Sequence, residues 1–215
     1  MDFVAELLII APPILFALTI HEYAHGWVAY RLGDPTAKDA GRLTLNPLAH
    51  LDPIGTLMLF IVKLGWAKPV PVNPYNFRDP RRDMMWVSFA GPASNFLAAF
   101  GLAIVFKLAA GSFPYGVGAG SLLDVILLML RWGILINIIL GVFNLIPIPP
   151  LDGSKILMGF LPPAYAHQFA QLERFGPFLL IFILMFSHMM RLNIFWVLIS
   201  PFVAIFSVLL GIRLF

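Results

Sequence analysis

The sequence has no cysteine and few charged residues. Without thiols there is neither a disulfide framework nor a thiolate metal site, so a bound metal would need His, Asp or Glu. Charged residues make up 12% of the 215 residues and hydrophobic residues 60%, whereas ordinary soluble domains are about a quarter charged and about half apolar. This balance predicts an integral membrane protein embedded in the lipid bilayer.

The charge pattern argues against a nucleic-acid partner and against a cleaved signal peptide. The net charge is +3, but the basic residues lie beside apolar stretches, where they fix the orientation of a chain in a membrane. We therefore expect no nucleic-acid partner. The first apolar stretch has the acidic residues Asp2 and Glu6 at its start and no basic residue before it, which is the wrong polarity for a cleaved signal peptide. We expect this segment to remain in the mature protein.

Long apolar runs predict an all-α polytopic membrane protein with about five transmembrane helices. A bilayer core of about 30 Å takes about 20 helical residues. The predicted spans cover approximately residues 4–30, 84–110, 123–146, 175–189 and 194–214. A sixth apolar run, residues 54–66, is about a dozen residues long and favours a re-entrant or interfacial segment.

Basic residues predict the topology. They flank the short run 54–66 on both sides, which places both flanks in the cytoplasm. These residues are Arg31, Lys38, Arg42, Lys68, Arg78, Arg81 and Arg82. The uncharged loop 111–120 then lies outside, as does the N-terminus, while residues 147–174 and the C-terminus are cytoplasmic. Arg131, inside a predicted span, and Arg191, in an external turn, fit this scheme poorly, and Arg131 requires a later helix start, snorkelling or a partner.

Residues 65–76 read GWAKPVPVNPYN, and their prolines favour an extended backbone. Two interpretations stay open at this point. The segment is either a simple loop or a small β element at the membrane surface, whose edge could pair with an unwound substrate peptide.

The residues that carry chemistry are HEYAH, from His21 to His25. Histidines four apart on a helix lie one turn apart on the same face, so both can bind one zinc ion while Glu22 reaches a water molecule. Zinc lowers the pKa of that water to about 7, and Glu22 then acts as general base in attack on a peptide carbonyl. A histidine in an apolar helix is often a packing residue instead, but three ionisable groups within one turn of a membrane helix are costly without such a function.

A catalytic zinc ion needs a third protein ligand. The candidates outside the first helix are Asp152, His50, Asp52, His167, Glu173 and His188. Asp152 stands out because it ends the run NLIPIPPLD, where prolines break a helix at membrane depth and so favour a cavity. Alternatively, Asp152 caps a short helix that begins at Gly153 or Ser154.

Three spaced motifs resemble the site-2 protease family of intramembrane zinc metalloproteases. They are HEYAHGW at residues 21–27, GPASN at 91–95 and NLIPIPPLDG at 144–153, and GRLTLNPLAHLDPIGT at 41–56 resembles the prokaryotic branch. The likeness covers residues 19–156. It implies one Zn²⁺ per chain held by His21, His25 and Asp152, with Glu22 as catalytic base. Because the few charges cluster between long apolar runs, we expect a single domain over residues 1–215, with its catalytic core at about 4–156 and C-terminal helices at about 175–214.

The resemblance also implies a class of substrate and a location in the cell. Such proteases cleave a transmembrane segment of another membrane protein, often an anti-sigma factor or other tethered regulator, near the cytoplasmic face, and we expect a prokaryotic cytoplasmic membrane. The chain departs from many relatives because HEYAH lies in its first helix and because no insertion is long enough for a PDZ domain. Substrate choice therefore cannot rest on such a domain. The oligomeric state stays open.

Asn95 and Asn144 are polar residues in apolar surroundings. Either amide could donate to the developing oxyanion or hold the substrate backbone. Asn95 could instead join helices, since Ala90, Ser94 and Ala98 form a small-residue stripe on the same helix. The main alternative for the whole chain is a non-proteolytic metal-binding membrane protein or transporter, which has little reason to place Glu22 between two ligands; a structural subunit with a fortuitous motif would bind no zinc.

Overall fold

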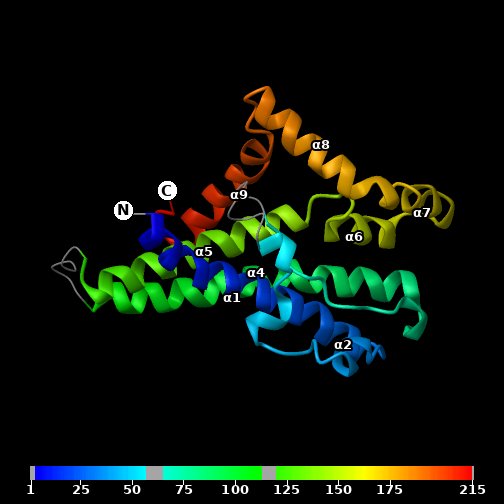
Figure 1. The fold of residues 1–215 in the computed structure, drawn as a ribbon, viewed down its shortest axis with the longest axis horizontal. Coiled ribbons are helices and arrows are strands. Elements are labelled where there is room, and N and C mark those ends of the chain that lie inside the picture. The colour runs from blue at the N-terminus through cyan, green and yellow to red at the C-terminus, as the bar shows by residue number, and fades with distance from the viewer. Residues whose placement is uncertain (1–2, 57–64, 113–119, 215) are drawn as a thin grey trace.

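A computed structural model describes residues 3–56, 65–112 and 120–214 of the chain (Figure 1). The α-helices are α1 (Phe3–Arg31), α2 (Thr36–Asp39), α4 (Pro80–Gly111), α5 (Leu122–Asn144), α6 (Asp152–Phe160), α7 (Pro163–Ala170), α8 (Gly176–Met189) and α9 (Ile194–Leu210). The 3₁₀ helices are η1 (Pro47–His50), η2 (Pro74–Asn76) and η3 (Glu173–Phe175). No β-sheet occurs within these ranges. The predicted all-α polytopic fold is confirmed.

Four helical segments of the described chain are long and apolar enough to cross a membrane: Leu7–Arg31, Pro80–Gly111, Leu122–Asn144 and Pro163–Ser187. The first three correspond to the first three predicted spans. The fourth begins earlier than predicted because α7 and η3 lead directly into α8. The helix α9 is apolar but shorter, at 17 residues. The predicted re-entrant run 54–66 falls largely on residues 57–64, outside the described residues.

The helices α1, α4 and α5 lie side by side along the long axis of the molecule, with α4 against both others and against α6 (Figure 1). Between α4, α5 and α9 the core is apolar and close-packed, with Ala99 and Ala103 facing Ile134 and Ile138. Lipid is as apolar as these side chains, so in a membrane such helices associate through close packing of small residues and through buried hydrogen bonds. The alanines of α4 permit that close approach.

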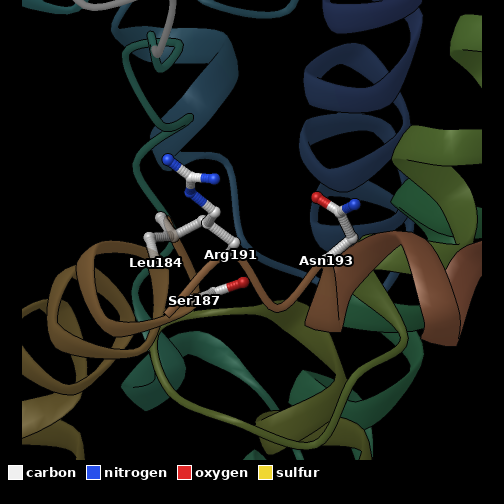
Figure 2. Close-up of a pocket in the computed structure, with 4 residues that line it drawn as sticks. All are labelled: Leu184, Ser187, Arg191 and Asn193. Carbon is white, nitrogen blue, oxygen red and sulfur yellow. The ribbon is translucent and has the colours of Figure 1, made fainter. Parts of the chain in front are cut away.

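The helix α8 stands off from this bundle and connects through a turn to α9, which runs back to pack against α5 (Figure 1). Phe178, Phe182 and Met185 on α8 are more than half exposed, as expected for side chains that face lipid. A pocket of about 330 Å³ lies at the turn between α8 and α9, lined by Leu184, Ser187, Arg191 and Asn193 (Figure 2). These four residues include no carboxylate or imidazole, so the pocket lacks the donors of a zinc site.

The break between α5 and α6 follows from the sequence Asn144–Gly153. The prolines at 147, 149 and 150 cannot continue a helix, and the chain turns back onto the end of α5. A Cβ on Gly153 would lie 2.3 Å from the carbonyl oxygen of Leu145 and 2.5 Å from that of Ile146, so only glycine fits this return. The fold thus brings Asp152, the first residue of α6, back to the bundle.

The segment after residue 65 is extended, as its prolines predict, but it forms a single antiparallel bridge, between Leu51 and Ala67, rather than a strand within the described residues. Its far end is tied down by Asp34, which is fully buried and accepts hydrogen bonds from Asn73 N at 2.7 Å and from Asn76 Nδ2 at 2.6 Å. Burial opposes ionisation of Asp34, but hydrogen bonds from Thr36, Asn76 and Asn73 outweigh it and lower the pKa of this carboxyl.

Arg131, which fitted the predicted spans poorly, has a partner. Its helix does not start later, because α5 begins at Leu122. The guanidinium instead donates a hydrogen bond of 2.7 Å to the main-chain oxygen of Arg213, near the C-terminus. Of the three explanations that the sequence allowed, pairing is the one that the structure shows. Such a charge-assisted bond satisfies a cation that apolar surroundings would otherwise disfavour.

Candidate metal centre

Three side chains from two distant parts of the chain converge at the centre of the bundle. The helix α1 supplies His21 and His25, one turn apart, and the start of α6 supplies Asp152. Asp152 Oδ2 lies 3.2 Å from His21 Nε2 and 3.3 Å from His25 Nε2, and the two Nε2 atoms are 3.0 Å apart. No other group of three metal-ligating side chains occurs among the described residues.

Hydrogen bonds fix the direction of both imidazole rings. His25 Nδ1 lies 2.7 Å from the carbonyl oxygen of Val87, which can only accept, so Nδ1 carries the hydrogen. His21 Nδ1 lies 2.7 Å from Asn95 Oδ1, and the amide nitrogen of Asn95 is used elsewhere, so Nδ1 donates here as well. In neutral rings both Nε2 atoms therefore present lone pairs to the centre, as metal-bound histidines do.

These atoms fit a zinc ion on the chemistry of the donors alone. Two imidazole lone pairs and one carboxylate oxygen face one another with no hydrogen between them, and Asp152 Oδ2 is buried without a hydrogen-bond partner among the described residues. Such an arrangement of acceptors is repulsive unless a cation lies between them. Zinc bonds of about 2.0–2.2 Å in a tetrahedron place ligand atoms about 3.3 Å apart, close to the observed separations.

Asn95 of α4 joins three helices. It is fully buried, and its Nδ2 donates to the carbonyl oxygen of Ala17 on α1 at 3.1 Å and to Asn137 Oδ1 on α5 at 2.9 Å. Asn137 is also fully buried and donates to the carbonyl oxygen of Gly133 at 2.8 Å. Helix association, one of the two interpretations of Asn95, is therefore what its contacts show, and through His21 the same amide reaches the metal centre.

Asn137 was missed by the sequence analysis, although a lone asparagine in the middle of an apolar run was a usable signal. A buried amide inside a membrane helix needs a partner. By contrast, Asn144 donates to the carbonyl oxygen of Leu140 in its own helix, at 3.0 Å. An oxyanion-stabilising role stays a prediction for Asn95 and Asn144.

The remaining candidates for the third ligand are not in this group. His50 is buried, and its Nε2 contacts the carbonyl oxygen of Thr44 at 2.8 Å. Asp52 accepts a hydrogen bond from Gly55 N at 2.7 Å. Neither His167 nor Glu173 belongs to the metal group found in the described residues, and the side chain of His188 lies outside them. Asp152 does not cap α6, whose N-cap is Leu151 with no side-chain cap bond.

Close packing by α4 completes the centre. Gly91 faces the two rings so closely that a Cβ there would lie 2.5 Å from His25 Nε2 and 2.6 Å from His21 Cε1. Glu22 is not part of the metal group. Its Oε2 instead accepts a hydrogen bond of 2.8 Å from the main-chain N–H of Val70. The arrangement therefore offers three side chains that could hold a metal ion and one neighbouring carboxylate outside that group.

We predict that Asn95→Leu weakens zinc binding by about 10- to 100-fold, the usual effect of losing a partner that orients a metal-bound histidine. Leucine has the same branched shape but leaves His21 Nδ1 and Asn137 Oδ1 without their partner. Zinc affinity measured by competition with a chelator checks this. Asn144→Leu is the matched control, since among the described residues its amide donates to Leu140 of the same helix, and an equal loss in both variants would contradict the assignment.

Comparison with known proteins agrees with this geometry. Residues 9–187 match the model of peptidase family M50. The chain is 40% identical over 185 residues to "Putative zinc metalloprotease YwhC" of Bacillus subtilis, covering 85% of this chain and 82% of that protein. It is 31% identical over 189 residues to "Putative zinc metalloprotease Rip2" of Mycobacterium tuberculosis, covering 83% and 66% respectively. No solved structure matches it significantly.

The family match covers both helical regions that supply the convergent side chains, α1 and the start of α6. The motifs that carried the resemblance, residues 21–27, 91–95 and 144–153, all fall within it. The chain belongs to peptidase family M50, the site-2 type of zinc metalloprotease.

Proposed function

We propose that this zinc metalloprotease hydrolyses peptide bonds in or near transmembrane segments of other membrane proteins, with His21, His25 and Asp152 as ligands of one Zn²⁺ and Glu22 as general base. The observation that carries the proposal is the convergence of two imidazole nitrogens, from a helix long and apolar enough to cross a membrane, on a buried carboxylate oxygen of Asp152. Family membership supplies the reaction class, metal-assisted peptide hydrolysis.

The residues divide the work between binding and proton transfer. Zinc held by the three ligands supplies Lewis acidity, which acidifies water and polarises the peptide carbonyl. Glu22 adjoins the ligand His21 but lies outside the ligand set, so its carboxylate can take the proton of the attacking water and pass it to the departing amine. Asn95 and Val87 keep the two rings in the orientation in which Nε2 faces the ion.

The setting of the centre supports a membrane-protein substrate. His21 and His25 lie within the apolar helical segment Leu7–Arg31, so a peptide must reach them from within or beside the bilayer. We propose a single integral-membrane domain over residues 1–215 in a prokaryotic cytoplasmic membrane, with the N-terminus outside and the C-terminus in the cytoplasm. The distribution of basic residues supports this orientation.

A transporter or metal-binding protein, the alternative considered from the sequence, is not favoured by the family match. The position of Glu22 argues in the same direction. A transport site has no use for a carboxylate that lies beside the ligands but outside the ligand set.

Metal removal tests the proposal. We expect the protein purified in detergent to contain one zinc ion per chain and to cleave members of a panel of single-pass membrane proteins. Treatment with a chelator should abolish cleavage, and added Zn²⁺ should restore it, because the side chains of His21, His25 and Asp152 cannot act as a Lewis acid without the ion. Metal analysis and gel-based cleavage assays measure both effects. Cleavage that survives complete zinc removal would refute the proposal.

A further inference from the structure

A backbone group from a distant segment holds the carboxylate of Glu22. The Val70 N–H donates to Glu22 Oε2 at 2.8 Å, across 48 residues of sequence. Val70 lies between Pro69 and Pro71, and proline has no N–H. Within this Pro-Val-Pro triplet, Val70 therefore provides the one backbone donor, and that donor is directed at Glu22.

The side chain of Val70 is seated against α1 by a glycine. Gly26 lies four residues after Glu22 and so on the same face of the helix, one turn further on. A Cβ on Gly26 would lie 3.2 Å from Val70 Cγ1 and 3.3 Å from Ala37 Cβ. Because Gly26 has no side chain, Val70 packs directly on the helix and is only 8% exposed. The Pro-Val-Pro backbone therefore lies close to the part of α1 that carries Glu22.

The segment that carries Val70 is fixed at both ends. On one side, Ala67 forms the bridge with Leu51, and Lys68 N donates to the carbonyl oxygen of His50 at 2.9 Å. On the other side, Asn73 N donates to the buried Asp34 carboxylate at 2.7 Å. Val70 lies midway between these anchors. Its N–H is thus presented to Glu22 by a preorganised backbone and not by a free loop.

We propose that the Val70 N–H is a positioning group for Glu22, which it holds in the orientation for proton transfer and out of the zinc ligand set. The inference rests on the proposed function of Glu22 as general base. A free glutamate beside a zinc ligand can rotate about three bonds, and a carboxylate is itself a good zinc ligand. A charge-assisted bond to a fixed N–H removes that freedom for one oxygen and orients the carboxylate before substrate arrives.

The direct test removes this one hydrogen. Replacing Val70 by its α-hydroxy acid turns the amide into an ester, which keeps the side chain but has no N–H. We expect kcat for a transmembrane substrate to fall about 10- to 100-fold, KM to change less than about twofold, and zinc content to stay at one per chain. Val70→Pro should show the same split if it folds, while Val70→Ala, which keeps the N–H, should retain kcat within about threefold.

A second measurement tests whether the loss of rate in the ester variant depends on Glu22. In a Glu22→Asp background the shorter side chain no longer reaches Val70 N, so the ester should lower the remaining rate by less than about twofold. An ester variant with the parental kcat would overturn the inference, and so would a Val70→Ala variant as slow as the ester, because packing would then be the cause. Failure of the proposed function is separate: the parent chain itself would not cleave.

Discussion

Glu22→Gln is expected to leave one zinc ion bound per chain while lowering the rate of peptide cleavage by at least about 100-fold, the lower end of the usual contribution of a general base. Glutamine has the same shape, and its carbonyl oxygen can still accept the hydrogen bond from Val70 N. The amide cannot take a proton from water, so chemistry is lost without loss of geometry. Single-turnover cleavage rates and metal analysis of the purified variant give both quantities.

The same substitution at Glu173 provides the control. Glu173 lies in η3, outside the metal group, and the change in net charge is identical. We expect Glu173→Gln to cleave at the parental rate. A Glu22→Gln variant that still cleaves would exclude Glu22 as the base, whereas one that loses its zinc would move Glu22 into the ligand set. A zinc transporter would keep moving its ion with glutamine in place.

The helical spacing of His21 and His25 made these two residues of the candidate metal centre predictable from the sequence. Two histidines four apart in an apolar run must share a helical face, and α1 places His21 and His25 in that way. The turn that returns Asp152 was predictable only as a break, because prolines and Gly153 show where a helix stops but not which neighbour the chain meets next. The broken helix made Asp152 the leading candidate among several, and the resemblance to site-2 proteases then decided between a ligand and a helix cap.

The contacts that orient the site were not predictable from local pattern. Val70 acts through its backbone N–H, which every residue except proline has, so no side-chain motif marks it. Asn137 meets Asn95 only because α4 and α5 pack with that register. Whether residues 65–76 form a strand could not be predicted from their sequence either. An extended segment becomes a strand only when a partner pairs with it along its length. Among the described residues this segment has one bridge, between Leu51 and Ala67.

Gly91→Ala is expected to lower zinc affinity by about 100-fold and to abolish cleavage at ordinary zinc concentrations. The added Cβ would lie 2.5 Å from His25 Nε2 and 2.6 Å from His21 Cε1, far inside van der Waals contact. Neither ring can yield at low cost, because Val87 and Asn95, on the same helix α4, hold their Nδ1 atoms. One or both rings must turn away from Asp152, and the three ligand atoms then no longer converge.

Gly101→Ala separates this effect from the general consequences of adding a methyl group to α4. A Cβ at Gly101 meets nothing within 4 Å among the described residues, so alanine there should raise helix stability by up to about 1 kcal/mol and leave zinc affinity unchanged. At Gly91 the same gain in propensity competes with an overpacking cost of about 1–3 kcal/mol. The free energy of unfolding should therefore be lower for Gly91→Ala than for Gly101→Ala by about 1–3 kcal/mol, while zinc affinity, measured by competition with a chelator, should differ by about two orders of magnitude. Equal zinc affinities would mean that the rings move aside freely and that α4 does not constrain the metal centre.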